Sequence, residues 1–124
     1  MIETRSAPKA REGTWLWLFK IVAGVLVVAL LGLHFLVNHL FAPTGLLTHA
    51  EVVTYYQNPI IPVIEVAFLL LVISHSLVGL RSIVLDLNPS DRVLKVIDIL
   101  FWLAGIGFSI YGVWLAIAIA QLGR

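Results

Sequence analysis

The residues most suited to chemistry lie at the end of the second long apolar run, where ionisable side chains are costly and usually functional. If that run is helical, four of its residues fall on one face, at i, i+4, i+7 and i+11: His75, Gly79, Ser82 and Asp86. Arg81 points away from that face by roughly a third of a turn. Because glycine has no side chain, Gly79 leaves a hollow one turn from the imidazole. The pattern predicts a histidine beside a space that admits a flat, bulky group.

The composition is that of an integral membrane protein. Sixty per cent of the 124 residues are hydrophobic, only 12% are charged, and the mean hydropathy is +1.03. A soluble domain of this length cannot hide so much apolar surface, because small domains bury only part of their chain. The absence of cysteine excludes disulfides, thiolate catalysis, and iron–sulfur or zinc sites built on cysteine. A formal net charge of +1 is too small to indicate a nucleic-acid partner.

Three apolar runs predict an all-α membrane protein with three transmembrane helices. Each run has the roughly 20 residues that a helix needs to cross a bilayer, and the expected spans are about 15–41, 60–86 and 95–121. They form one domain, 15–124, after a polar segment, 1–14, that is expected to be a flexible cytoplasmic tail. A secretory signal peptide is excluded, because the first run is too long and no A-x-A site follows it.

Two connecting segments carry helix-start signals. Thr48-His49-Ala50-Glu51 has the spacing of a capping box and predicts a short interfacial helix through Tyr55-Tyr56. Asn88-Pro89-Ser90-Asp91 predicts a turn with a helix cap before the third span.

Lysine and arginine gather at one side of the predicted membrane. The first loop, 42–59, has none, and the amino-terminal segment and second loop region carry most of them. These residues are Arg5, Lys9, Arg11, Lys20, Arg81, Arg92 and Lys95. Because positive residues stay on the cytoplasmic side, the amino terminus is expected in the cytoplasm and the carboxy terminus outside. The expected location is the bacterial cytoplasmic (inner) membrane.

Two histidines lie inside the predicted spans, at different depths. His34 lies about eight residues before the outer end of the first span, or roughly 12 Å below the outer surface. His75 lies about fifteen residues into the second span, or roughly 22 Å below that surface. A separation of about 10 Å argues against one metal or haem held by both. Two haems, each completed by a partner subunit's histidine, would fit, and so would one haem at His75 with another role for His34.

The end of the second span also resembles a known family. The pattern H-x3-G-x-R-x4-D is similar to that of the small cytochrome b anchors of succinate dehydrogenase, specifically the type known as the hydrophobic membrane anchor. Its residues here are His75, Gly79, Arg81 and Asp86. In many relatives a tyrosine that helps to hold quinone follows the aspartate, and in this chain that residue is Leu87.

The first span resembles the family segment W-L-F-x-R-x-S-G-V, which a histidine follows ten residues after the glycine. This chain has Trp17-Leu18-Phe19-Lys20-Ile21-Val22-Ala23-Gly24-Val25 there, and His34 keeps the spacing. Ile21 and Ala23 replace the arginine and the serine, so the family's polar contacts are expected to be absent or replaced by Lys20. The resemblance covers most of the chain, from about residue 15 into the third span.

The resemblance implies a four-part succinate:quinone oxidoreductase in which this chain is a non-catalytic subunit. A flavoprotein subunit oxidises succinate, an iron–sulfur subunit relays the electrons, and two membrane anchors carry haem b and quinone. The three helices would then be half of a haem-binding anchor bundle that a second cytochrome b anchor subunit completes. Whether the complexes form a trimer stays open, as do the number of haems, the type of quinone and the direction of electron flow.

The resemblance implies roles for five residues, and the place of Lys20 near the inner end of the His34 face suggests one for a sixth. His75 would be the axial ligand of the inner haem b and, in relatives with two haems, His34 that of the outer one. Four polar residues would lie near haem propionates or a quinone head: Lys20, Arg81, Ser82 and Asp86. The structural alternative is a hydrogen bond across a helix interface for each histidine, and an interface anchor and a helix-end ion pair for Arg81 and Asp86.

Two other functions stay open. The chain could be a purely structural anchor that has lost haem, with quinone reduced directly from the iron–sulfur subunit. It could instead form an oligomeric proton or ion pathway. The relay groups would then be His34, Glu65, His75 and Asp86. The other histidines, His39 and His49, are expected to be solvated or interfacial, and Glu65 to contact water.

Overall fold

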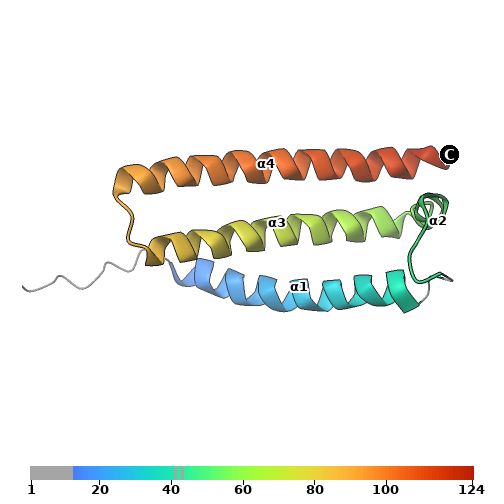
Figure 1. The fold of residues 1–124 in the computed structure, drawn as a ribbon, viewed down its shortest axis with the longest axis horizontal. Coiled ribbons are helices and arrows are strands. Elements are labelled where there is room, and N and C mark those ends of the chain that lie inside the picture. Colours follow the sequence, from blue (N-terminus) through green and yellow to red (C-terminus); the bar gives the residue numbers. More distant parts are fainter. Residues whose placement is uncertain (1–12, 41, 43) are drawn as a thin grey trace, which may run out of the picture.

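The computed structural model describes residues 13–40, 42 and 44–124, and it is all-helical with no strand in these ranges (Figure 1). Its helices are α1 (Thr14–Leu40), α2 (His49–Tyr55), α3 (Ile60–Asp86) and α4 (Asp91–Leu122). The three long helices are long and apolar enough to cross a membrane. The predicted all-α class with three such helices is confirmed, whereas the predicted flexible tail, apart from residues 13 and 14, lies outside the described residues.

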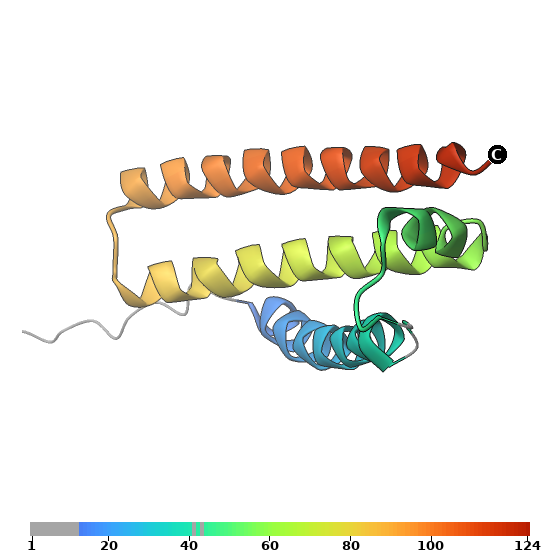
Figure 2. The ribbon, with the colours of Figure 1, turned by 45° about the vertical axis from the view of Figure 1, so that its right-hand side comes forward.

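The helix α3 lies between the other two long helices and packs against both (Figures 1 and 2). The start of α1 and the connection from α3 to α4 lie at one end of the molecule. The short helix α2, which contacts α4, lies at the other end with the carboxy terminus. Consecutive long helices therefore run in opposite directions, as three successive membrane crossings require.

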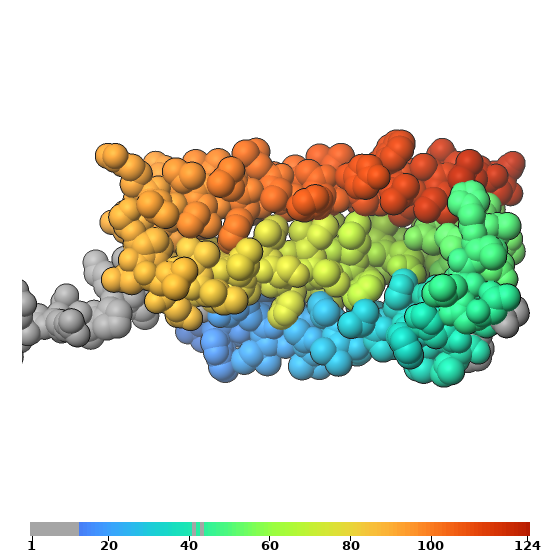
Figure 3. Space-filling model, viewed as in Figure 1, coloured from blue at the N-terminus to red at the C-terminus, as the bar shows by residue number. Residues whose placement is uncertain are grey.

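Very little of the described chain is shielded from its surroundings. Its buried residues are Ala23, Ala42 and Ala116. In Figure 3 the side chains of α3 reach the surface between those of α1 and α4. Large apolar residues such as Trp102 are mostly exposed. This pattern suits a lipid environment, where apolar side chains need no protein cover and helices approach each other at small residues.

Small residues set the contact between α3 and α4. A Cβ added at Gly105 would lie 2.9 Å from Cδ1 of Leu77, and one added at Gly112 would collide with Leu69. Both glycines lie in α4 and both leucines in α3. These two glycines therefore allow the α3 leucines to pack against the α4 backbone.

Both predicted helix caps are present. The backbone N–H of Thr48 donates to Oε2 of Glu51 at 2.6 Å, and the Glu51 N–H donates to Oγ1 of Thr48 at 3.4 Å, which is the reciprocal pattern of a capping box. Hydrogen bonds from the Thr48 backbone and side chain lower the pKa of Glu51. At α4, the Val93 N–H donates to Oγ of Ser90, so this helix begins earlier than the span expected from 95.

Candidate functional site

His75 lies in the contact between α1 and α3. A Cβ added at Gly24 of α1 would lie 3.2 Å from Cε1 and 3.8 Å from Nε2 of the imidazole, so the ring packs against a helix that lacks a side chain there. Gly24 thus allows the imidazole of α3 to approach the α1 backbone closely. Nδ1 of His75 is buried and has no hydrogen-bond partner among the described residues. A buried polar atom without a partner is costly, so this ring has an unused bonding capacity.

Gly79, where the sequence predicts a hollow beside His75, borders open space. A Cβ added at Gly79 would meet no atom within 4 Å, in contrast to one added at Gly24. The space beside the helix is therefore open one turn after the histidine.

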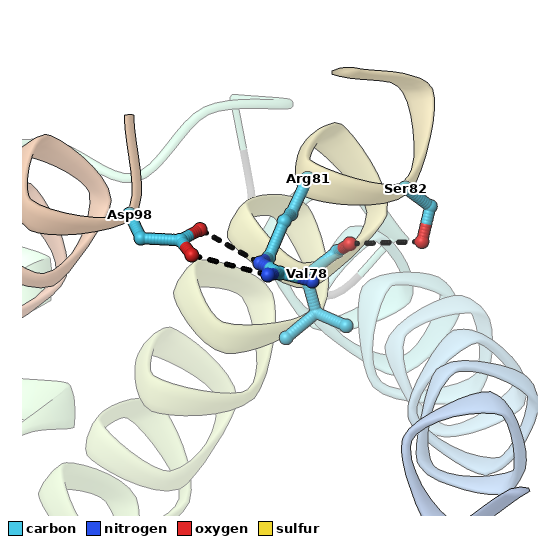
Figure 4. Close-up of polar contacts among 4 residues, drawn as sticks. All are labelled: Val78, Arg81, Ser82 and Asp98. Carbon is cyan, nitrogen blue, oxygen red and sulfur yellow. Dashed lines mark hydrogen bonds and ion pairs between the residues drawn. The ribbon is translucent and has the colours of Figure 1, made fainter. Parts of the chain in front are cut away.

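Two of the predicted polar residues meet between α1 and α3, towards the end where α3 finishes. Nζ of Lys20 donates a hydrogen bond of 2.8 Å to Oγ of Ser82. Ser82 follows His75 by about two turns of α3 and lies on the same face. Ser82 also donates to the carbonyl of Val78 at 3.3 Å (Figure 4). Lys20 thus supplies a polar contact in the segment where Ile21 and Ala23 replace the family's arginine and serine.

Arg81 turns the other way, towards α4 (Figure 4). Its Nε donates to Oδ1 of Asp98 at 2.7 Å and its Nη2 to Oδ2 at 3.1 Å, a bidentate ion pair in which both side chains are partly exposed. A cavity of about 410 Å³ adjoins the pair, and most of its other lining residues, such as Trp102, are apolar. Asp86 is exposed at the end of α3. The predicted polar set is therefore divided between the two sides of α3.

Asp98 was missed by the sequence reasoning. A usable signal existed, because Asp98 is an acid within the third apolar run at nearly the same distance from the α3–α4 turn as Arg81. Opposite charges at matching depths in neighbouring membrane helices are expected to pair.

His34 contacts Glu65 of α3. Nδ1 of His34 lies 3.4 Å from Oε1 of Glu65, and its ring centroid lies 5.8 Å from that of Phe68. The side chain of Glu65 is 19% exposed, against 43% for His34, so its expected contact with water stays a prediction. Both residues line a cavity of about 120 Å³ together with Tyr55. Burial and the nearby Glu65 charge raise the pKa of Tyr55.

The two membrane histidines belong to separate places in the fold. His34 of α1 contacts Glu65 of α3, and His75 of α3 packs against Gly24 of α1. Along each helix the two contacts are about ten residues apart, or roughly 15 Å along the helix axis. No group of three His, Cys, Asp or Glu side chains able to hold a metal occurs within the described ranges. His39 and His49 are exposed, and Nδ1 of His39 lies 2.9 Å from the carbonyl oxygen of Gly45.

Comparisons with known proteins match nearly the whole chain. Residues 3–110 match the family described as succinate dehydrogenase/fumarate reductase transmembrane subunit. The succinate dehydrogenase hydrophobic membrane anchor subunit of Archaeoglobus fulgidus is 33% identical over 119 residues, which cover 96% of this chain and 100% of that protein. No solved structure gives a significant match. The predicted resemblance is confirmed, and together with three helices able to span a bilayer it identifies a multi-pass membrane protein.

Proposed function

Because the chain belongs to the family of succinate dehydrogenase/fumarate reductase transmembrane subunits, we propose that it anchors such a complex and holds haem b through His75. Its partners would be a flavoprotein subunit, an iron–sulfur subunit and a second cytochrome b anchor subunit. In this complex the chain would bind no succinate itself. It would provide ligands and surroundings for the groups that pass electrons from the iron–sulfur subunit to membrane quinone.

The observation that carries the haem assignment is the state of the His75 ring. Its Nδ1 is buried without a partner among the described residues, and its ring is packed on Gly24, where no side chain displaces it. The open space at Gly79 lies one turn away. These features fit a histidine that ligates haem iron, and haem b bound there would supply one-electron transfer. The absence of a multi-ligand metal group in the described chain does not conflict with this, because an axial haem site needs only one histidine from each side.

A second haem at His34 would complete the proposal. The cavity of about 120 Å³ at His34 is much smaller than the several hundred cubic ångströms of a typical ligand pocket. A haem there would therefore need a wall from another subunit. The open three-helix arrangement, with α3 reaching the surface between α1 and α4, supports a bundle that a second anchor completes (Figure 3).

The polar residues at the α3–α4 turn would lie on the cytoplasmic side, near the iron–sulfur subunit and quinone. Support comes from Lys and Arg, which are absent from the loop 42–59 at the opposite end. The amino terminus would then be cytoplasmic and the carboxy terminus outside, in a bacterial cytoplasmic membrane. Lys20 and Ser82 form one polar group and Arg81 another, beside the cavity of about 410 Å³. Asp86 is exposed and could contact a propionate, a quinone or the iron–sulfur subunit.

The haem b content of the purified complex, measured by pyridine haemochrome per copy of this chain, tests the proposal. We expect two haems, one for each membrane histidine. One haem would remove one of the two ligand roles, and the haem content of a His75→Ala variant would then show whether His75 holds the remaining one. No haem would overturn the haem assignment and leave a structural anchor, with quinone reduced directly from the iron–sulfur subunit.

Substitution of Gly24 tests whether the packing of His75 matters for haem. In Gly24→Ala the added Cβ would lie 3.2 Å from the ring, closer than ordinary contact, so we expect a displaced imidazole and a partial loss of the inner haem. Gly24→Leu should remove that haem almost completely. Gly32→Ala is the matched control in the same helix, because its Cβ would meet nothing within 4 Å. Equal haem spectra and contents in the Gly24 and Gly32 variants would contradict the expectation.

A further inference from the structure

The two proposed haem ligands differ in what holds their Nδ1 atoms. Nδ1 of His75 is buried and has no hydrogen-bond partner among the described residues. Nδ1 of His34 lies 3.4 Å from a carboxylate oxygen of Glu65, on the neighbouring helix. Nothing in the proposed function accounts for an acidic residue at this place.

The position of Glu65 within an apolar helix makes its carboxylate energetically costly. Glu65 follows the first residue of α3 by five positions, or roughly 7 Å along the axis, and only 19% of its side chain is exposed. A carboxylate within an apolar span is rare and is usually paired or functional. The ion-pair contact that the described structure gives Glu65 is with His34. Glu65 also lines the cavity of about 120 Å³ between the start of α3 and the end of α1, so the carboxylate and the His34 ring border the same space.

The contact favours one tautomer of the His34 ring over the other. A carboxylate next to Nδ1 favours the tautomer in which Nδ1 carries the proton, so the lone pair lies on Nε2. Within the described part of the chain, Nε2 of His34 has no polar partner. The His34 ring also lies beside Phe68, at an interplanar angle of 36°. The side chain is 43% exposed, so part of the His34 ring is accessible to a group bound between subunits.

We propose that Glu65 is the positioning residue of the outer haem site: it holds Nδ1 of His34 so that Nε2 is presented to the haem iron. This inference rests on the proposed function, in which His34 ligates an outer haem b. A carboxylate beside an axial imidazole strengthens the ligand as an electron donor and stabilises the more positive, oxidised iron. Glu65 should therefore lower the reduction potential of the outer haem and leave that of the inner haem unaffected.

Redox titration of the haem absorbance in the purified complex tests this role. Glu65→Gln removes the charge but keeps the size and an acceptor oxygen, and Glu65→Leu removes both. We expect the outer haem to titrate at a higher potential in both variants, with the larger shift in Glu65→Leu. The low-spin electron paramagnetic resonance signal of the outer haem should also change in Glu65→Leu, because the imidazole loses its orienting contact. If Glu65→Leu does not assemble, Glu65→Gln alone decides.

Two further variants make the result specific. Glu51→Gln removes a carboxylate from the same end of the molecule, but Glu51 contacts Thr48 and not a histidine, so both potentials should stay as in the parent complex. His34→Ala should remove the outer haem. If it does so while both Glu65 variants keep the parent potentials and spectra, the role of Glu65 is overturned and that of His34 stands. If His34→Ala leaves the haem content unchanged, the ligand role of His34 fails, and the role of Glu65 fails with it.

Discussion

Replacing His75 with alanine is expected to remove one full haem b equivalent from each complex, with loss of the inner-haem absorbance. In the proposal the imidazole provides the axial ligand from α3. No other described histidine lies close enough to replace it, because His34 contacts α3 at Glu65, ten residues before His75. Assembly is expected to survive, because the substitution removes a buried Nδ1 that has no hydrogen-bond partner in the described structure. The measurements are the pyridine haemochrome content and the amount of assembled complex.

His39→Ala is the matched control for that experiment. His39 lies near the end of α1, is exposed, and contacts the Gly45 carbonyl rather than another long helix. We expect the parent haem content in this variant. An assembled His75→Ala complex with unchanged haem content would refute the assignment of His75 as a ligand.

Replacing Arg81 with methionine is expected to destabilise the complex by on the order of 2 kcal/mol, because it leaves the Asp98 carboxylate without its bidentate partner near the membrane. The charge of Asp98 would then lose its best compensation within a largely apolar contact between α3 and α4. Asp98→Leu should have a similar effect, because Arg81 then loses its bidentate carboxylate partner. The thermal unfolding midpoint of the purified complex and the amount assembled in the membrane report the change.

The double variant Arg81→Met/Asp98→Leu should lose less stability than the sum of the losses in the two single variants, because it removes both charges together. Lys95→Met is the control, because it removes an exposed positive charge close to Asp98 in the sequence but not the ion pair. Simple additivity in the double-mutant cycle would show that the pair does not join the two helices. If the single variants assemble normally yet lose quinone reduction, Arg81 acts mainly on quinone.

The sequence by itself determined the features that depend on local interactions. Hydropathy and run length predicted three membrane-spanning helices, because the cost of exposing polar backbone in lipid leaves few other structures for such runs. The caps at Thr48 and Ser90 were predictable because a capping side chain bonds to an N–H only three residues away. The face shared by His75 and Ser82 followed from the helical repeat. The motifs in the first two long helices also sufficed to predict the family that the comparisons show.

The tertiary structure decided which residues face each other across the helix contacts. Arg81 pairs with Asp98, His34 with Glu65, and the His75 ring packs on Gly24. These contacts depend on the rotation and axial register of whole helices, which side-chain packing along their full length sets and no local pattern encodes. For this reason the sequence located His34 and His75 at separate depths but could not show that one has a carboxylate neighbour and the other a buried nitrogen without a described partner.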